Sequence, residues 1–216
     1  VGLEKIKIEA LDRERPLTES FIRDLNKTIL VENYWETSRT EESLPTRIEI
    51  RVGEYKSRPN SVITSTGEEF KYAAPEETAA MMTTLVAWCN EAMTDSKLTP
   101  IEIATLFHYR FIRIHPFQDG NGRIARLIVN FILYRFGYPM VIIHSEDKSN
   151  YLSALRQSDV EVGFSPSDGA NASLAQIQPF LKYMVTQLER SLELSIKAAK
   201  GESIEDDSDF GKQLTI

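Results

Sequence analysis

The sequence has 216 residues and a formal net charge of −7, with 42% hydrophobic and 26% charged residues. This composition suits a globular domain with a sizeable core and excludes collagen-like and wholly disordered chains. An acidic chain with a pI near 5.2 repels a long phosphate backbone, so we expect no nucleic acid partner. No apolar run approaches the length of a membrane span, so we expect no membrane partner either.

Cysteine usage and the chain ends suggest a compartment and a domain layout. The single Cys89 excludes an internal disulfide and a Cys-x-x-Cys metal site, which fits a reducing compartment, and we expect a cytoplasmic protein. The chain starts at Val1 without a signal-peptide pattern, which suggests a fragment or a trimmed N-terminus. We divide it into a lead segment (1–14), a main domain (15–200) and an acidic, solvated tail (201–216).

Helical patterns account for most of the chain. Six segments carry them, at residues 17–31, 75–93, 100–114, 121–136, 148–159 and 174–199. The apolar positions of the second recur every three or four residues, as in a buried stripe, at Ala79, Met82, Val86, Cys89 and Met93. Thr99, Pro100 and Glu102 form a capping box that starts the third. The fourth is apolar on most sides and stops at Gly137, so we expect it to be the central helix.

Strand patterns are few. Residues 47–52 alternate apolar and polar side chains, and residues 61–64 and 70–72 flank a polar turn, as in a small hairpin. One hairpin does not make a sheet-based fold. We therefore expect a mainly α fold with a small β appendage.

Residues 115–126, HPFQDGNGRIAR, form a loop that feeds a helix N-terminus. Gly120 and Gly122 let the backbone approach a ligand, and the first N–H groups of the following helix lack intrahelical partners at its positive end. These features predict an anion cradle. Arg123 and Arg126 lie three residues apart on one helix face, which points to a polyphosphate.

Two further side chains of this loop could take part in chemistry, as a metal ligand and as a base. Asp119 offers a hard oxygen ligand that can hold Mg²⁺ next to phosphates, or it caps the helix. His115 titrates near neutrality and can take a proton from an attacking hydroxyl. Ion pairing is the structural alternative for the two arginines. His108 and His144 fit structural positions better than functional ones.

Other nucleotide motifs do not explain the loop. Gly120, Gly122 and Ala125 match the dinucleotide pattern G-x-G-x-x-A, but that pattern follows a strand, and here a helix precedes it. The Gly-Lys-Ser/Thr of a Walker loop does not occur in the sequence.

The loop resembles the signature of the Fic family, HxFx[DE]GNGRxxR, at every specified position. Residues 17–25 are similar to the family's leading helix, 53–56 to its GxYR element and 151–155 to its tyrosine-containing nucleotide helix. The resemblance covers about residues 15–190. It implies a Fic-type helical core with a small β-hairpin flap. It also implies an enzyme that transfers AMP from ATP to a Ser, Thr or Tyr hydroxyl of a target protein and releases pyrophosphate.

The resemblance also implies a function for each residue of the signature. His115 would be the base, Asp119 the ligand of Mg²⁺ at the α- and β-phosphates, and Phe117 a core anchor for the loop. The nucleotide-binding set would be Gly120, Asn121 and Gly122 as the anion hole, Arg123 at the β-phosphate and Arg126 at the γ-phosphate.

Two elements outside the signature are implied less directly. Val62, Ile63 and Thr64 would form the flap edge that pairs with an extended segment of the target. Tyr151 stays open between adenine contact and packing, because Leu152 follows where the family often has a second tyrosine. Gly122 separates this chain from the Doc branch, which has lysine there and phosphorylates its target.

Alternatives and regulation stay open. One alternative is a family member that removes AMP from a modified protein, and another is a silent nucleotide-binding interaction module. Residues 28–33 match the letters of the family's inhibitory motif [ST]xxxE[GN], which we interpret as coincidence because they end the leading helix. An inhibitory segment upstream, an inhibitory partner or a homo-oligomer remains possible.

Overall fold

The computed structural model describes residues 1–39, 44–63 and 69–202. Within them lie the helices α1 (Gly2–Leu11), α2 (Glu19–Leu30), α3 (Pro75–Asp95), α4 (Pro100–Ile114), α5 (Asn121–Arg135), α6 (Lys148–Val162), α7 (Pro166–Ala170) and α8 (Gln178–Ala199), and the 3-10 turn η1 (Ser145–Asp147). Two antiparallel hairpins join β1 (Tyr34–Arg39) to β2 (Pro45–Ile50) and β3 (Val62–Ile63) to β4 (Glu69–Phe70). The predicted mainly α fold with a small hairpin is confirmed.

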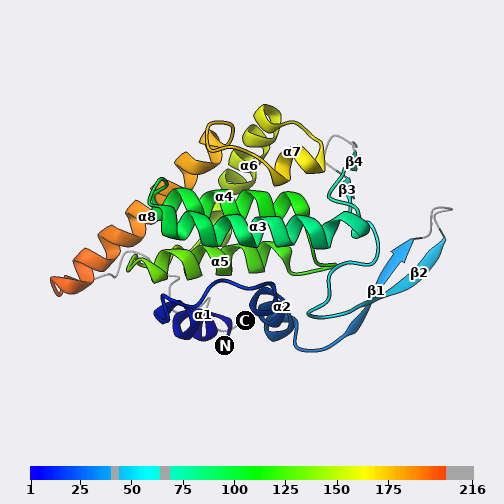
Figure 1. The fold of residues 1–216 in the computed structure, drawn as a ribbon, viewed down its shortest axis with the longest axis horizontal. Helices are drawn as coiled ribbons and strands as arrows, with labels where there is room; N and C mark the ends of the chain where they lie inside the picture. The colour runs from blue at the N-terminus through cyan, green and yellow to red at the C-terminus, as the bar shows by residue number, and fades with distance from the viewer. Residues whose placement is uncertain (40–43, 64–68, 203–216) are drawn as a thin grey trace.

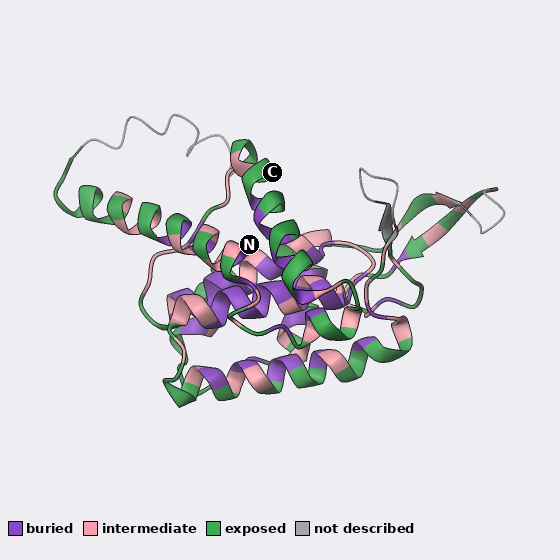
Figure 2. Ribbon diagram, turned by 90° about the horizontal axis from the view of Figure 1, so that it is seen from above, coloured by how far each residue is buried: buried purple, intermediate pink, exposed green. Residues whose placement is uncertain are grey.

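The centre of the core is the pair α4 and α5. Both helices are buried on most sides, through side chains such as Phe107 and Phe111 on α4 and Ile128 and Phe131 on α5. Figure 2 shows the buried residues gathered along these helices, while the outer helices present exposed faces. α3, α7 and α8 contact α4, whereas α1 and α2 contact α5. The predicted central position of residues 121–136 is confirmed.

Helix ends follow local chemistry. The Glu102 carboxylate accepts the Thr99 N–H at 2.7 Å, which confirms the capping box at the start of α4. The last helix was predicted from residue 174 but begins at Gln178. Proline restricts the residue before it and lacks an N–H, so the helix accepts Pro179 only in its first turn.

The buried stripe of α3 differs from the prediction at both ends. Met82, Val86 and Cys89 are buried as expected, but Ala79 is exposed and the preceding Thr78 is fully buried. Met93 is only partly buried, and the preceding Ala92 is buried in its place. The Thr78 hydroxyl donates to the Ala74 carbonyl at 2.9 Å, so its polar group is satisfied inside the helix. Hydrophobicity alone favours Ala79, and this backbone bond is why that prediction was wrong.

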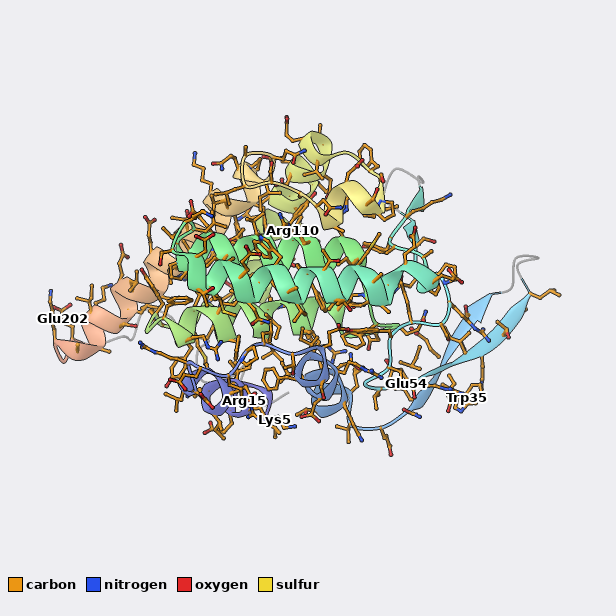
Figure 3. All side chains as sticks on the ribbon, in the orientation of Figure 1. Lys5, Arg15, Trp35, Glu54, Arg110 and Glu202 are labelled. Atoms are coloured by element: carbon orange, nitrogen blue, oxygen red, sulfur yellow. The ribbon has the colours of Figure 1, made fainter. Side chains whose placement is uncertain are left out.

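The predictions lack α1, β1 and two short elements, the 3-10 turn η1 and the helix α7. α1 lies within the lead segment and buries Ile6 and Ala10 in the same core as α5. β1 pairs with β2 from Tyr34 opposite Ile50 outward, and the predicted strand 47–52 becomes Pro45–Ile50. This hairpin projects from the helical body (Figure 1), and Figure 3 shows Trp35 on it, away from the helices and 64% exposed.

Among the described residues, no helix combines the length and the apolar character that crossing a bilayer requires. The domain boundaries at residues 14 and 200 remain predictions. Most of the predicted acidic tail, residues 203–216, lies outside the described residues.

His108 is a core histidine, as predicted. Its side chain is fully buried on α4, and its Nε2 lies 3.1 Å from the Tyr151 hydroxyl. Burial, aided by the nearby charge of Arg126, lowers the pKa of His108 to about 3. The folded protein therefore holds this imidazole neutral down to acidic pH.

Replacing His108 with Gln should weaken the dependence of stability on pH. Below a pKa of about 6.5 the unfolded chain protonates this histidine while the folded protein does not, so the free energy of unfolding falls as pH drops from about 6.5 toward 3. We expect the slope between pH 6 and pH 5 to be smaller in His108→Gln by about 1 kcal/mol per pH unit. Urea unfolding at each pH measures this, and equal slopes would contradict the assignment.

Candidate active site

The loop between α4 and α5 turns sharply at both ends. His115 has left-handed backbone angles, φ 53° and ψ 60°, and Gly120 has φ 85° where α5 begins. A Cβ at Gly120 would lie 3.0 Å from the Asn26 amide nitrogen, so both conformation and space require glycine. The Asn26 amide itself donates to the Asp119 carbonyl at 3.0 Å. α2 thus holds the loop that opens α5.

The loop lies at the end of the bundle where both hairpins lie (Figure 1). It lines a cavity of about 600 Å³. The structure brings together there all of the predicted base, metal and nucleotide-binding residues: His115, Asp119, Gly120, Asn121, Gly122, Arg123, Arg126 and Tyr151. Two parts of the predicted flap, Val62 and Ile63, form β3, while Thr64 lies outside the described residues. Shared lining does not test the individual assignments, which stay predictions.

The His115 ring is held on one edge and one face. Its Nδ1 lies 2.8 Å from the Asn60 amide nitrogen and 3.2 Å from that of Asn121. Tyr72 stacks on it with ring centroids 4.0 Å apart and planes 10° apart. Burial first, and then the positive charge of Lys56, lowers the pKa of His115 to about 3. The imidazole is therefore neutral at pH 7, as a proton acceptor must be.

The Asp119 carboxylate is ionised and ready for a cation. Burial raises its pKa, but hydrogen bonds from the Tyr34 hydroxyl, the Gly120 N–H and Arg123 outweigh burial and hold the pKa below its usual value. Tyr34 donates to Oδ2 at 2.7 Å, and Arg123 donates to the same oxygen at 3.0 Å. The side chain remains 41% exposed.

The single carboxylate of Asp119 suits a metal ion whose other ligands are water and substrate oxygens. The described residues contain no group of three or more histidine, cysteine or acidic side chains able to hold an ion. Mg²⁺ commonly uses one or two carboxylates and completes its shell with phosphate oxygens and water. The single carboxylate of Asp119 beside an anion cradle fits that pattern.

Cationic groups converge on the N-terminus of α5. The Arg126 guanidinium lies next to Gly122 in the first turn, where a Cβ would be in ordinary contact with it at 3.4 Å. Lys148 and Arg156 of α6 line the same cavity. Together with the unpaired N–H groups of the first turn, these charges make the cavity suited to a polyanion.

Another arginine of the cavity, Arg113, has a structural position. Its guanidinium is buried, pairs with Asp159 at 3.0 Å and donates to the Gly163 and Ser165 carbonyls. These bonds tie α4 to the segment between α6 and α7, so this cation is already engaged.

The Asn121 side chain holds the loop together. It is buried, its Oδ1 accepts the Phe117 N–H at 2.9 Å, and its Nδ2 donates to the Phe117 carbonyl at 2.7 Å. The Phe117 ring is 1% exposed, which confirms it as the core anchor. What Asn121 offers an anion is therefore its backbone at the start of α5.

Tyr151 packs, and it also reaches the cavity. It is 7% exposed, and its ring lies near those of His108, Phe180 and Tyr183. Packing is therefore confirmed, while the adenine contact stays a prediction. The segment 28–33 does not line the cavity: Glu32 lies exposed just after α2.

Besides the cavity cations Lys148 and Arg156, sequence reasoning missed four side chains that hold the functional groups of the loop. Tyr34 follows α2, Asn60 precedes β3 and Tyr72 follows β4, and no motif or periodicity sets them apart. Lys56 carried a weak signal, as the last residue of the element similar to GxYR. All four reach the loop through contacts between segments far apart in sequence.

The Tyr34→Phe variant should raise the pKa of Asp119. The lost hydroxyl no longer stabilises the carboxylate, and a hydrogen bond of this kind on a partly exposed group is worth about half to one pKa unit. Carboxyl ¹³C NMR titration measures the shift. Tyr138→Phe, beyond the opposite end of α5, is the control and should leave Asp119 as in the wild type. An unchanged Asp119 pKa in Tyr34→Phe would contradict the assigned bond.

Comparisons with known proteins agree with this geometry. A Fic-domain-containing signalling protein from Bacteroides thetaiotaomicron VPI-5482 is 64% identical, with a TM-score of 0.88 over 95% of this chain and 72% of that one. Fic-1 from Caenorhabditis elegans is 25% identical, with a TM-score of 0.65 over 94% of this chain and 50% of that one. Protein adenylyltransferase fic-1 of Caenorhabditis briggsae is 34% identical over 135 residues, 62% of this chain and 24% of the relative.

The family relation rests on the main domain. The chain spans about a quarter of the length of the curated relatives it matches. Residues 16–133, more than half of the chain, match the Fic/DOC family and include the whole 115–126 loop. The family resemblance of the sequence is confirmed, and this chain belongs to the Fic/DOC family.

Proposed function

We propose that this chain is a Mg²⁺-dependent protein adenylyltransferase, which transfers AMP from ATP to a Ser, Thr or Tyr hydroxyl of a target protein and releases pyrophosphate. The observation that carries the proposal is the single cavity where the neutral His115, the ionised Asp119 and the positive N-terminus of α5 meet. Relatives named protein adenylyltransferase support it. The cysteine usage favours a cytoplasmic location.

The triphosphate would bind along the first turn of α5. Backbone N–H groups after Gly120 would take phosphate oxygens, with Arg123 at the β-phosphate and Arg126 at the γ-phosphate. Arg126 is partly buried between Gly122 and Tyr151, which limits its motion. Fixed positive groups that need no rearrangement stabilise the charge that develops during phosphoryl-type transfer.

Asp119 would hold Mg²⁺ through a carboxylate oxygen that Tyr34 and Arg123 occupy in the free protein. The ion supplies charge neutralisation on the phosphates when bound. Arg123 is half-exposed and can turn from Asp119 toward a phosphate.

His115 would take the proton of the target hydroxyl. The hydroxyl oxygen then bonds to the α-phosphorus, and the bond from that phosphorus to the bridging oxygen breaks as pyrophosphate leaves. A pKa near 3 is low for a base. The negative charge of a bound triphosphate beside the ring favours the imidazolium, so the pKa of His115 rises when substrate binds.

The target would pair with the edge of the flap. β3 is a two-residue strand in a two-stranded sheet, so one of its edges has no strand partner among the described residues. An extended segment can add to such an edge through main-chain hydrogen bonds, which tolerates varied side chains.

The His115→Ala variant should lose transfer but keep nucleotide binding. General base catalysis contributes about 10²- to 10⁴-fold, so labelling of target or self from α-labelled ATP and Mg²⁺ should fall by that factor. The ATP-induced rise in melting temperature should persist, because the phosphates bind elsewhere. His144→Ala is the control and should label normally. Equal labelling by wild type and His115→Ala would remove the base, and ATP stabilisation without any labelling would favour a silent binding module.

The Arg126→Ala variant should bind ATP more weakly. Losing charge-assisted hydrogen bonds of about 1.5–3 kcal/mol raises the dissociation constant roughly 10- to 100-fold. Titration calorimetry measures this, with Arg47→Ala on the exposed β2 hairpin as the control. Mass spectrometry of lysate proteins should show an adenylyl mass gain that falls with Arg126→Ala. An unchanged affinity would place the triphosphate elsewhere.

A further inference from the structure

The edge of His115 that faces the protein meets hydrogen-bond donors. Asn60 Nδ2 and Asn121 Nδ2 both approach Nδ1, at 2.8 and 3.2 Å. A neutral imidazole has one nitrogen that donates and one that accepts. Nδ1 is therefore the acceptor, and the ring hydrogen sits on Nε2.

Other partners fix the orientation of both amides. Lys56 Nζ, which has only hydrogens to offer, donates to Asn60 Oδ1 at 2.9 Å, while Asn60 Nδ2 donates to the Phe117 carbonyl at 2.8 Å. For Asn121, the Phe117 N–H donates to Oδ1. Turning either amide around would set donor against donor. The tautomer of His115 therefore follows from the network.

Lys56 is what holds the Asn60 amide in place. It is 4% exposed, and its ammonium donates to Asn60 Oδ1 and to the Ile114 carbonyl at 3.0 Å. A buried ammonium that lost one acceptor would be left with an unsatisfied N–H, which is costly. Asn60 cannot rotate cheaply while Lys56 stays charged.

This arrangement has a consequence for the proposed reaction. With Nδ1 occupied, Nε2 is the ring nitrogen left to meet a substrate in the cavity, and in this tautomer it carries a hydrogen. It cannot accept a proton until the tautomer exchanges, in which Nε2 loses its hydrogen to water and Nδ1 gains one from water. The new Nδ1–H would then need an acceptor where two amides now donate.

We propose that Asn60, held by Lys56, is a positioning residue that keeps His115 in a resting Nε2–H tautomer. The kinetic consequence of this inference rests on the proposed function. The assignment of the tautomer rests only on the hydrogen-bond network. Rotation of the Asn60 amide would present Oδ1 to Nδ1–H and free the Nε2 lone pair for the target hydroxyl.

The Asn60→Asp variant tests this with almost no change in shape. A carboxylate accepts from Lys56 and from Nδ1–H at once, so it should move the ring hydrogen to Nδ1. The Phe117 carbonyl loses the Asn60 donor but keeps the bond from Asn121 Nδ2 at 2.7 Å. In the wild-type chain, labelled with ¹⁵N-histidine, the ring spectrum should show His115 as Nε2–H, and Asn60→Asp should show it as Nδ1–H. The chain has three histidines, so His108→Gln and His144→Gln complete the assignment. Asn171→Asp, exposed after α7, is the charge-matched control.

The rate provides the second readout. In single-turnover labelling at saturating Mg²⁺ and ATP, Asn60→Asp should be faster than wild type on the order of tenfold, the factor expected for about 1.4 kcal/mol of tautomer preference. The affinity for ATP should stay within about twofold, since Asn60 does not line the cavity. A purely structural residue would slow the reaction when replaced.

Each contrary result overturns a distinct claim. A wild-type spectrum with Nδ1–H, or an Asn60→Asp spectrum that keeps Nε2–H, removes Asn60 as the determinant of the tautomer. A shifted tautomer without a faster reaction contradicts the claim that the Nε2–H tautomer is a resting state that slows the reaction. A shifted tautomer with no labelling by any variant counts against the proposed adenylyl transfer and leaves the tautomer assignment standing.

Discussion

Three carboxamide side chains hold the loop that opens α5, and the site depends on them. Asn26 reaches the Asp119 carbonyl from α2, Asn60 reaches the Phe117 carbonyl from the approach to β3, and Asn121 closes the loop on itself. A loop that presents free N–H groups to a ligand cannot use them for its own stability. Its carbonyls are bonded instead by side chains, two of them from other segments of the chain, which leaves the anion-binding edge open.

The same constraint explains why distant segments share the fold with the signature. The Asn26 amide oxygen also accepts the Gly53 N–H at 2.8 Å, and the Lys56 N–H donates to the Pro116 carbonyl at 2.8 Å. The leading helix, the GEYK segment and the loop are thus one hydrogen-bonded unit. Replacing any one member leaves buried polar groups unpaired in the other two.

In the free protein, the charged and polar groups of the site are satisfied by neighbouring side chains. Tyr34 and Arg123 satisfy the Asp119 carboxylate, and Asn60 and Asn121 satisfy the imidazole of His115. Both groups have hydrogen-bond partners without a ligand. When phosphates and a cation bind, these partners must move away or share the group with the ligand. The contacts that stabilise the empty site must therefore be broken or shared before the reaction, which is a common property of buried polar networks.

The sequence by itself determined the helical class, the central place of residues 121–136, the loop with its chemistry-bearing residues and the family. These follow from local signals, namely apolar periodicity, a capping box and a contiguous motif. Only the tertiary structure decided the partners of those residues: Tyr34 on Asp119, Asn60 and Tyr72 on His115, and α1 on α5. Such contacts join segments tens of residues apart, and a polar side chain in a loop carries no mark of the partner that folding will bring to it.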